Sequence, residues 1–178
     1  YQHGGLDYPL VLNISTTVDL SINLSAGWNW ISFNVAPEDA SLDVLLSELS
    51  ESASFIASQS SGIATNYGEW GWAGSLEALD VTQMYRLDMA SAATLTITGM
   101  PVDVATTPIN LSAGWNWISY LPQGILAVND ALATVTGTLN DQIKNPNGSA
   151  VYYGEEYGWV GSLGSMSPGE GFMLNVAV

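Results

Sequence analysis

Hydrophobic and polar residues alternate in a short stretch that the chain contains twice. Ile22 to Ser32, with the sequence INLSAGWNWIS, recurs without a change at Ile109 to Ser119. The alternation on either side of a Ser-Ala-Gly breaker predicts two strands joined by a turn. The second strand, Trp28 to Val35 and again Trp115 to Leu121, is apolar at successive positions, which predicts a central strand covered on both faces. We therefore expect four tryptophans to lie in the core: Trp28, Trp30, Trp115 and Trp117.

A helical period follows each copy of this stretch. Apolar residues stand at one-turn spacing at Leu42, Leu45, Leu46 and Leu49, and again at Val128, Ala131, Leu132 and Val135. This spacing predicts one short amphipathic helix per copy, packed on the sheet. The residues available to cap these helices are Asp39 or Ser41 in the first copy and Asn129 or Asp130 in the second.

Further strands follow each helix. Ser54 to Ser58 and Tyr67 to Leu76 predict glycine-punctuated hairpin strands, and Val151 to Leu163 is their counterpart in the second copy. Met84 to Leu87 matches Gly171 to Leu174 as the next strand. Thr94 to Thr98 predicts a last strand that has no counterpart after the second copy. The expected fold class is mainly β with one short helix per repeat (α+β), with antiparallel sheets in two homologous lobes that arose by internal duplication and are related by a pseudo-twofold axis.

A second anchor fixes the register of the repeat. Gly71 to Leu76 (GWAGSL) matches Gly158 to Leu163 (GWVGSL), with the same shift of 87 positions as the first anchor. We expect residues 1–20 to form an N-terminal strand segment, 21–100 repeat 1, 101–107 a linker and 108–178 repeat 2. Leu10, Leu12 and Ile14 alternate with other residues, so this segment could complete the second lobe. It could do so within the molecule, or it could enter a neighbouring copy and produce self-association by β-augmentation.

Composition narrows the classes of function. The formal net charge is −15 with only two basic residues, Arg86 and Lys144, which excludes nucleic acid as a partner and disfavours anionic membranes. No apolar run is long enough for membrane insertion. There are no cysteines, His3 is the sole histidine, and no nucleotide or zinc motif occurs, so we expect no enzymatic activity. Abundant Ser, Thr, Asn and Gly indicate a secreted or cell-surface location.

The predicted hairpins carry the chemistry that suits a binding site. Each hairpin is rich in aromatic residues, with acidic side chains between them. Aromatic rings stack on the apolar face of a sugar, while carboxylates accept hydrogen bonds from its hydroxyls. The predicted ligand-binding residues are Tyr67, Trp70, Trp72, Tyr152, Tyr153, Tyr157 and Trp159. For Trp72 and Trp159, which recur in the GWxGSL motif, the alternative is a place in the core.

Some carboxylates could bind calcium, which takes six to eight oxygen ligands. The residues available are Glu38, Asp39, Asp43, Glu155 and Glu156. The alternative role of these side chains is helix capping and a solvated surface. We expect no other cofactor.

The two anchors also carry a resemblance. LSAGWNWIS followed by a helix and then by YGxxGWxGSL resembles the tandem Gly-Trp-rich modules found near the C-termini of large secreted or surface-attached bacterial proteins. The resemblance covers nearly the whole chain, and it departs at Gly171-Phe172, where the first copy has Met84-Tyr85. It implies a non-catalytic accessory unit that binds carbohydrate.

The expected function is therefore a secreted, non-catalytic accessory module that binds a polysaccharide or surface glycan through its aromatic hairpin tips. The first alternative is a structural subunit of an extracellular fibre or surface layer, joined by strand donation from residues Leu10 to Ile14. The second alternative, ranked last, is a glycoside-active enzyme, which would need two carboxylates facing each other across a deep cleft.

Overall fold

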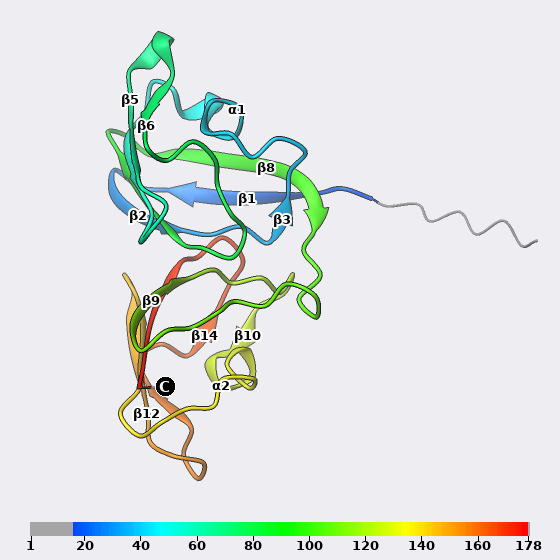
Figure 1. Cartoon of the computed structure of the whole chain (residues 1–178), viewed down its shortest axis with the longest axis vertical. Coiled ribbons are helices and arrows are strands. Elements are labelled where there is room, and N and C mark those ends of the chain that lie inside the picture. The colour runs from blue at the N-terminus through cyan, green and yellow to red at the C-terminus, as the bar shows by residue number, and fades with distance from the viewer. Residues whose placement is uncertain (1–15, 178) are drawn as a thin grey trace, which may run out of the picture.

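The computed structural model describes residues 16–177, and it shows a mainly β protein with antiparallel sheets and two short α-helices (Figure 1). The expectation of an antiparallel, mainly β fold is confirmed. The chain forms two lobes, each with its own hydrophobic core. The core of the first lobe draws on residues between Leu20 and Ile97, and the core of the second on residues between Ile109 and Val176. The predicted strand at Leu10 to Ile14 falls outside the described residues.

The first lobe contains eight strands in two sheets. One is a five-stranded sheet with the strand order β2-β7-β4-β5-β6, and the other is a three-stranded sheet with the order β1-β8-β3. The strands are β1 (Val18–Leu24), β2 (Gly27–Ile31), β3 (Val35–Ala36), β4 (Ala53–Ala57), β5 (Ile63–Asn66), β6 (Trp72–Gly74), β7 (Tyr85–Met89) and β8 (Ala93–Pro101). The helical elements are α1 (Leu42–Leu45) and the 3₁₀ turns η1 (Ser47–Leu49) and η2 (Gly68–Trp70).

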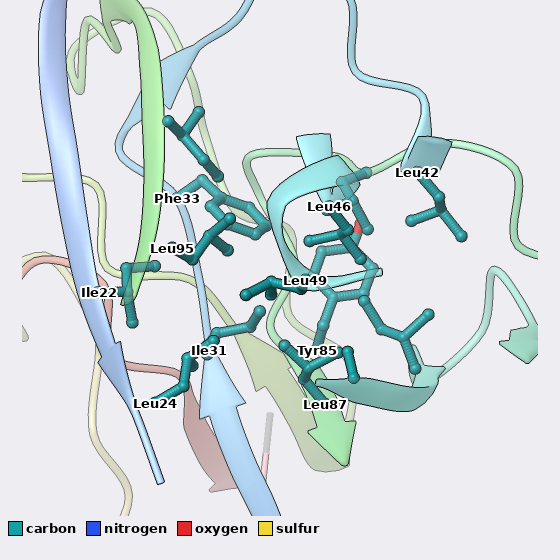
Figure 2. Close-up of a cluster of buried hydrophobic side chains, with 14 of the residues drawn as sticks. Ile22, Leu24, Ile31, Phe33, Leu42, Leu46, Leu49, Tyr85, Leu87 and Leu95 are labelled. Carbon is teal, nitrogen blue, oxygen red and sulfur yellow. The ribbon is translucent and has the colours of Figure 1, made fainter. Parts of the chain in front are cut away.

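The core of the first lobe lies between these two sheets and is closed at one end by the helix (Figure 2). Side chains alternate along a strand, so β1 and β8 each turn every second residue inward, including Ile22 and Leu95. Leu87 of β7 meets them from the five-stranded sheet, and Leu46 and Leu49 close the end. Burying each such side chain stabilises the fold by about 1.5–3 kcal/mol.

The second lobe has a five-stranded sheet of order β9-β15-β11-β12-β13 and a small sheet of order β10-β14. Its strands are β9 (Gly114–Ile118), β10 (Leu126–Ala127), β11 (Gln142–Asn145), β12 (Gly148–Tyr152), β13 (Trp159–Gly161), β14 (Ser165–Met166) and β15 (Phe172–Val176), and its helix is α2 (Val128–Ala131). The two five-stranded sheets connect their strands in the same order.

The predicted short helix is present in each copy as a single α-turn, and in the first lobe the 3₁₀ turn η1 follows it. Three other sequence expectations about local structure are wrong. Ser41 and Ala127 stand at the N-caps without a side-chain cap, so Asn129 and Asp130 do not cap α2. β2 is an edge strand of its sheet rather than a central one. Residues 109–111, which match the end of β1, form no strand because no described strand pairs with them.

The lobes are joined by reciprocal backbone pairing. Ile31 at the end of β2 forms an antiparallel bridge to Glu170, and Ile118 at the end of β9 forms one to Gln83. Each pair is related to the other by 87 positions, from 31 to 118 and from 83 to 170. The Ser32 N–H donates to the Gly169 carbonyl at 3.1 Å, and the Ser119 N–H donates to the Thr82 carbonyl at 3.4 Å. The five-stranded sheets therefore meet at β2 and β9.

Ser32 offers a test of this junction. Its buried hydroxyl donates to the Glu170 carbonyl at 2.6 Å and accepts from the Tyr120 N–H at 3.1 Å, whereas the hydroxyl of the matching Ser119 donates to the Phe33 carbonyl at 3.2 Å. Ser32→Ala leaves a buried N–H without its acceptor, so we expect it to lower the free energy of unfolding by about 1–3 kcal/mol. Ser119→Ala is the matched control, with an expected loss of about 1 kcal/mol. Urea denaturation measures both; equal losses would show that the acceptor role of Ser32 is unimportant.

Candidate functional site

The tip of the β5–β6 hairpin displays two aromatic side chains to solvent. The turn is closed by backbone hydrogen bonds from the Tyr67 N–H to the Gly71 carbonyl at 2.9 Å and from the Gly71 N–H to the Gly68 carbonyl at 3.0 Å. Both glycines have positive φ, 67° and 78°, a conformation that other residues adopt only with strain. Trp70 is 90% exposed and Tyr67 is also exposed. The hairpin thus holds an indole outside the core on a closed turn.

Asp43 of α1 latches this hairpin to the helix. Its Oδ1 accepts a hydrogen bond from the Trp72 N–H at 2.8 Å. A Cβ on Gly71 would collide with the same carboxylate oxygen, so the glycine is required for the close approach as well as for its φ. The latch fixes the tip relative to the helix.

A cleft of about 430 Å³ lies between the tip and the helix. Trp70 and Trp72 form its aromatic wall. Its polar lining comes from both elements: Asp43, Ser47, Ser50, Asn66 and Glu69. Trp72 is half-buried and packs against the core, so it contributes to the cleft only in part. An indole beside carboxylates, hydroxyls and an amide is a combination that suits a sugar ring.

The β12–β13 hairpin forms the matching tip of the second lobe. The Tyr153 N–H donates to the Gly158 carbonyl at 2.8 Å, and Asn129 accepts from the Trp159 N–H at 2.7 Å in the place where the first lobe has Asp43. Tyr153 and Tyr157 are exposed. Both lobes therefore use a residue of the short helix to hold the hairpin.

The seven predicted site residues divide into three groups. Tyr67, Trp70, Tyr153 and Tyr157 are exposed at the two tips. Trp72 and Tyr152 are half-buried and pack against the cores. Trp159 is only 5% exposed and packs on Tyr152, with ring centroids 5.4 Å apart, so its indole cannot present a face to a ligand. Its place is in the core, which is the alternative that the GWxGSL repeat left open.

The two tips lie at opposite ends of the long axis of the molecule. Figure 1 shows the β5–β6 hairpin at one end and the hairpin that follows β12 at the other. The predicted residues are thus brought together within each tip but not between tips.

Two tryptophans that we expected in the core lie instead on the open face of the joined sheets. Trp28 is 49% exposed and Trp115 is 38% exposed, while Trp30 and Trp117 are half-buried. Their strands turn Ile31 and Ile118 inward, so the tryptophans at alternate positions face outward. The expectation that Trp28 and Trp115 lie in the core is therefore wrong. Their strands are apolar on both sides, but on the outward side the tryptophans stack on cations and are not covered by another layer of the protein.

The only two cationic side chains of the chain stack on these tryptophans. The Arg86 guanidinium lies 4.7 Å from the ring centroid of Trp28 and 6.0 Å from that of Trp117 in the other lobe. The Lys144 ammonium lies 4.2 Å from the ring centroid of Trp115. Such contacts contribute about 0.5–2 kcal/mol each, more where the pair is desolvated. We did not predict the stacking of these cations on tryptophans from the sequence. The feature of the sequence that draws attention to them is that the chain has so few cations.

Two clefts flank this face at the junction between the lobes. One, of about 540 Å³, is lined by residues 21–25 and 28–31 of the first lobe and by residues 145–147 and 167–171 of the second. The other, of about 590 Å³, is lined mainly by residues 108–110, 112–113 and 115–118 together with Gln59, Ser60, Thr82 and Gln83. Each repeated INLSAGWNWIS segment thus lines one cleft with an exposed tryptophan. These clefts form a second place where a ligand could meet aromatic and polar groups.

The carboxylates considered for calcium have structural partners or stand apart. Asp39 Oδ1 accepts from the Ser41 N–H at 2.8 Å, and this hydrogen bond lowers the pKa of Asp39. Asp43 is engaged with Trp72, while Glu155 and Glu156 are exposed in the second tip. Among residues 16–177, no three His, Asp or Glu side chains come together in a way that could hold a metal ion.

Comparisons with known proteins found no matching family model, no matching curated protein and no matching solved structure. Across the part of the chain that the structure describes, no helix has the length and apolar character that crossing a membrane requires.

The latch leads to a prediction with a natural control. Asp43→Ala removes the acceptor of the Trp72 N–H, and we expect it to lower the free energy of unfolding by about 1 kcal/mol. Asp43→Asn keeps an Oδ1 acceptor and copies the Asn129 latch of the second lobe, so it is expected to remain within about 0.5 kcal/mol of the parent chain. Chemical denaturation monitored by circular dichroism measures both values. If both variants lost the same stability, charge rather than the hydrogen bond would be responsible.

The cleft residue Glu170 predicts a pH dependence. Burial raises its pKa above the ordinary value of 4.5, although hydrogen bonds from Ser167 lower the pKa in part. Because the pKa of this carboxyl is higher in the folded than in the unfolded protein, the stabilisation it gives is fully present below the unfolded-state pKa. The stabilisation is lost as the pH rises through the folded-state pKa. Glu170→Gln carries no such loss, so we expect it to have a higher melting temperature than the parent chain near neutral pH and the same one near pH 3. A difference that does not change with pH would rule out ionisation as its cause.

Proposed function

We propose that this protein is a non-catalytic extracellular module that binds polysaccharide or a surface glycan through its two aromatic hairpin tips. The observation that carries the proposal is the 90% exposure of Trp70 beside a cleft lined by carboxylate, hydroxyl and amide groups. An exposed indole is unfavourable in water, and a latched hairpin presents it in a fixed position, which reduces the entropy lost on binding.

The chemistry of the tip favours a neutral or weakly polar sugar. The indole of Trp70 offers a flat apolar surface, and Glu69 and Asn66 lie in the same cleft to accept from or donate to hydroxyls. A strongly anionic polysaccharide is disfavoured, because the formal charge of −15 would repel it at moderate ionic strength. The second tip offers Tyr153 and Tyr157 as narrower stacking surfaces.

The duplication and a pseudo-twofold relation between the lobes belong to this proposal. The identical strand order of the five-stranded sheets, the reciprocal bridges and the equivalent latches support them. Since the tips lie at opposite ends of the molecule, the two sites would bind separate glycan chains and cross-link them rather than occupy adjacent units of one chain. In a dense matrix such bridging raises the effective affinity by avidity.

A glycan array followed by affinity electrophoresis tests the tip site. We expect Trp70→Ala to weaken retention by a defined polysaccharide at least about tenfold, since truncating an aromatic anchor costs on the order of 2 kcal/mol. Trp28→Ala is the matched control, because it removes a half-exposed indole from the open sheet face. A loss with Trp28→Ala and none with Trp70→Ala would move the site to the clefts between the lobes.

The same samples distinguish the remaining classes of function. Retention that is unchanged by EDTA fits binding by stacking without calcium, and release of reducing sugar during incubation would contradict a non-catalytic role. Precipitation of the polysaccharide by the parent chain, abolished in both Trp70→Ala and Tyr157→Ala, is the expected sign of cross-linking. Absence of retention for every neutral polysaccharide on the array would overturn the proposal.

A further inference from the structure

The two edge strands at the junction differ in how their outer backbone groups are bonded. On β9, the side-chain amide of Gln59 from the first lobe bonds the strand at two points. Its Nε2 donates to the Trp115 carbonyl and its Oε1 accepts from the Trp117 N–H, both at 2.6 Å. One carboxamide thus takes the place of a neighbouring strand for one rung of the ladder. The outer edge of β9 is therefore closed by a side chain.

The matching edge of β2 lacks this side chain. The pairing of β4 with β7 and of β11 with β15 puts Ala57 and Lys144 at equivalent positions, 87 apart. Two residues further on, the place of Gln59 falls to Pro146, whose ring offers neither a donor nor an acceptor. Pro146 lines the cleft of about 540 Å³ beside β2, as Gln59 lines the cleft beside β9.

The groups left open on β2 are the Trp28 carbonyl and the Trp30 N–H. The Trp30 carbonyl accepts from the Gly171 N–H of the second lobe at 3.0 Å, so Trp30 turns its backbone groups away from β7. Trp28 faces the same way, because the direction of these groups alternates along a strand. Among residues 16–177, neither group has a hydrogen-bond partner on that outer side. The two groups continue the ladder of the junction by one rung.

We propose that this edge of β2 binds a glutamine side chain of a partner polypeptide, in the way that β9 binds Gln59. The partner's carboxamide donates to the Trp28 carbonyl and accepts from the Trp30 N–H. The cleft provides further contacts: Trp28 is 49% exposed, and the exposed Asn23 and Asn147 offer their amides to the peptide that carries the glutamine. This site takes a protein partner and does not depend on glycan binding at the tips.

The chemistry of the open rung selects a carboxamide. The rung needs one donor and one acceptor side by side, whereas a carboxylate has no donor and an ammonium or guanidinium group has no acceptor. The formal charge of −15 and the presence of Glu170 in the same cleft further disfavour an anionic group. A pair of sugar hydroxyls can both donate and accept, so an oligosaccharide is the competing occupant.

Backbone amide NMR spectra of the isotope-labelled full chain test this site. The probe is the capped peptide Ala-Ser-Gln-Ser-Ser, which copies residues 57–61. We expect the Trp30 amide resonance to shift progressively as the peptide reaches millimolar concentration, while the Trp117 amide, already bonded to Gln59, stays in place.

Two control probes separate the possible occupants. The same peptide with alanine in place of glutamine is expected to cause no shift. An equal shift with the alanine peptide would assign the edge to a peptide backbone and overturn the glutamine site. A larger shift of the Trp30 amide with cellotriose than with the glutamine peptide would assign the cleft to a glycan and would equally overturn it.

Two variants of the full chain exchange the properties of the edges. Gln59→Ala opens the edge of β9, so we expect the Trp117 amide to exchange with solvent about tenfold faster and to respond to the peptide. Pro146→Gln supplies a carboxamide to β2, so the Trp30 amide is expected to exchange about tenfold more slowly and to lose its response. A Trp30 response that persists in Pro146→Gln would contradict the proposal. So would a Trp30 amide that exchanges as slowly as the Trp117 amide in the parent chain.

Discussion

The backbone pairing between the lobes is the constraint on which the remaining arrangement depends. Buried peptide groups need partners, and the ends of β2 and β9 find theirs in the opposite lobe, through Ile31 with Glu170 and Ile118 with Gln83. One lobe cannot turn against the other without breaking these two bridges and the backbone hydrogen bonds beside them. With this pairing the two hairpin tips lie at opposite ends of the molecule. It also brings Trp28 of one edge strand and Trp117 of the other to the same guanidinium, that of Arg86. The junction between the lobes therefore keeps the two tips apart.

The electrostatics of the junction follow from the same geometry. A chain with a formal charge of −15 has little cationic surface, and its two cations are both placed on indole faces at the junction. Arg86 lies between Trp28 of its own lobe and Trp117 of the other, so it contributes to the contact between lobes as well as to its own sheet. Its Nε is buried without a hydrogen-bond partner among the described residues, so the attraction to the aromatic rings compensates its desolvation in part. Outside the junction the side chains that carry charge are acidic, and a net charge far from zero favours solubility through mutual repulsion.

The sequence predicted the elements well and their environment less well. Period-2 and period-3.6 patterns located the strands and both helices, because local patterns report which side of an element is apolar. They did not distinguish a buried tryptophan from one stacked on a cation, so Trp28 and Trp115 were assigned to the core. In the tips, Trp70 and Tyr157 are exposed, whereas Trp159, which was predicted as a ligand-binding residue with them, lies in the core, the alternative that its place in the GWxGSL motif had raised. The Asp43 and Asn129 latches could not be predicted, because a helix-to-hairpin hydrogen bond depends on how two elements pack.

The two lobes differ in how their cores are covered, and this difference bears on the second tip. In the first lobe β1 and β8 cover the core, whereas in the second lobe Ile109 and Leu111 lie half-buried and no strand among the described residues pairs with them. Ala131 and Leu132, at the end of α2, line the apolar groove beside these two residues, and Asn129 of the same helix accepts the hydrogen bond that holds the second tip. The position of the second tip therefore depends on a less enclosed core than the position of the first.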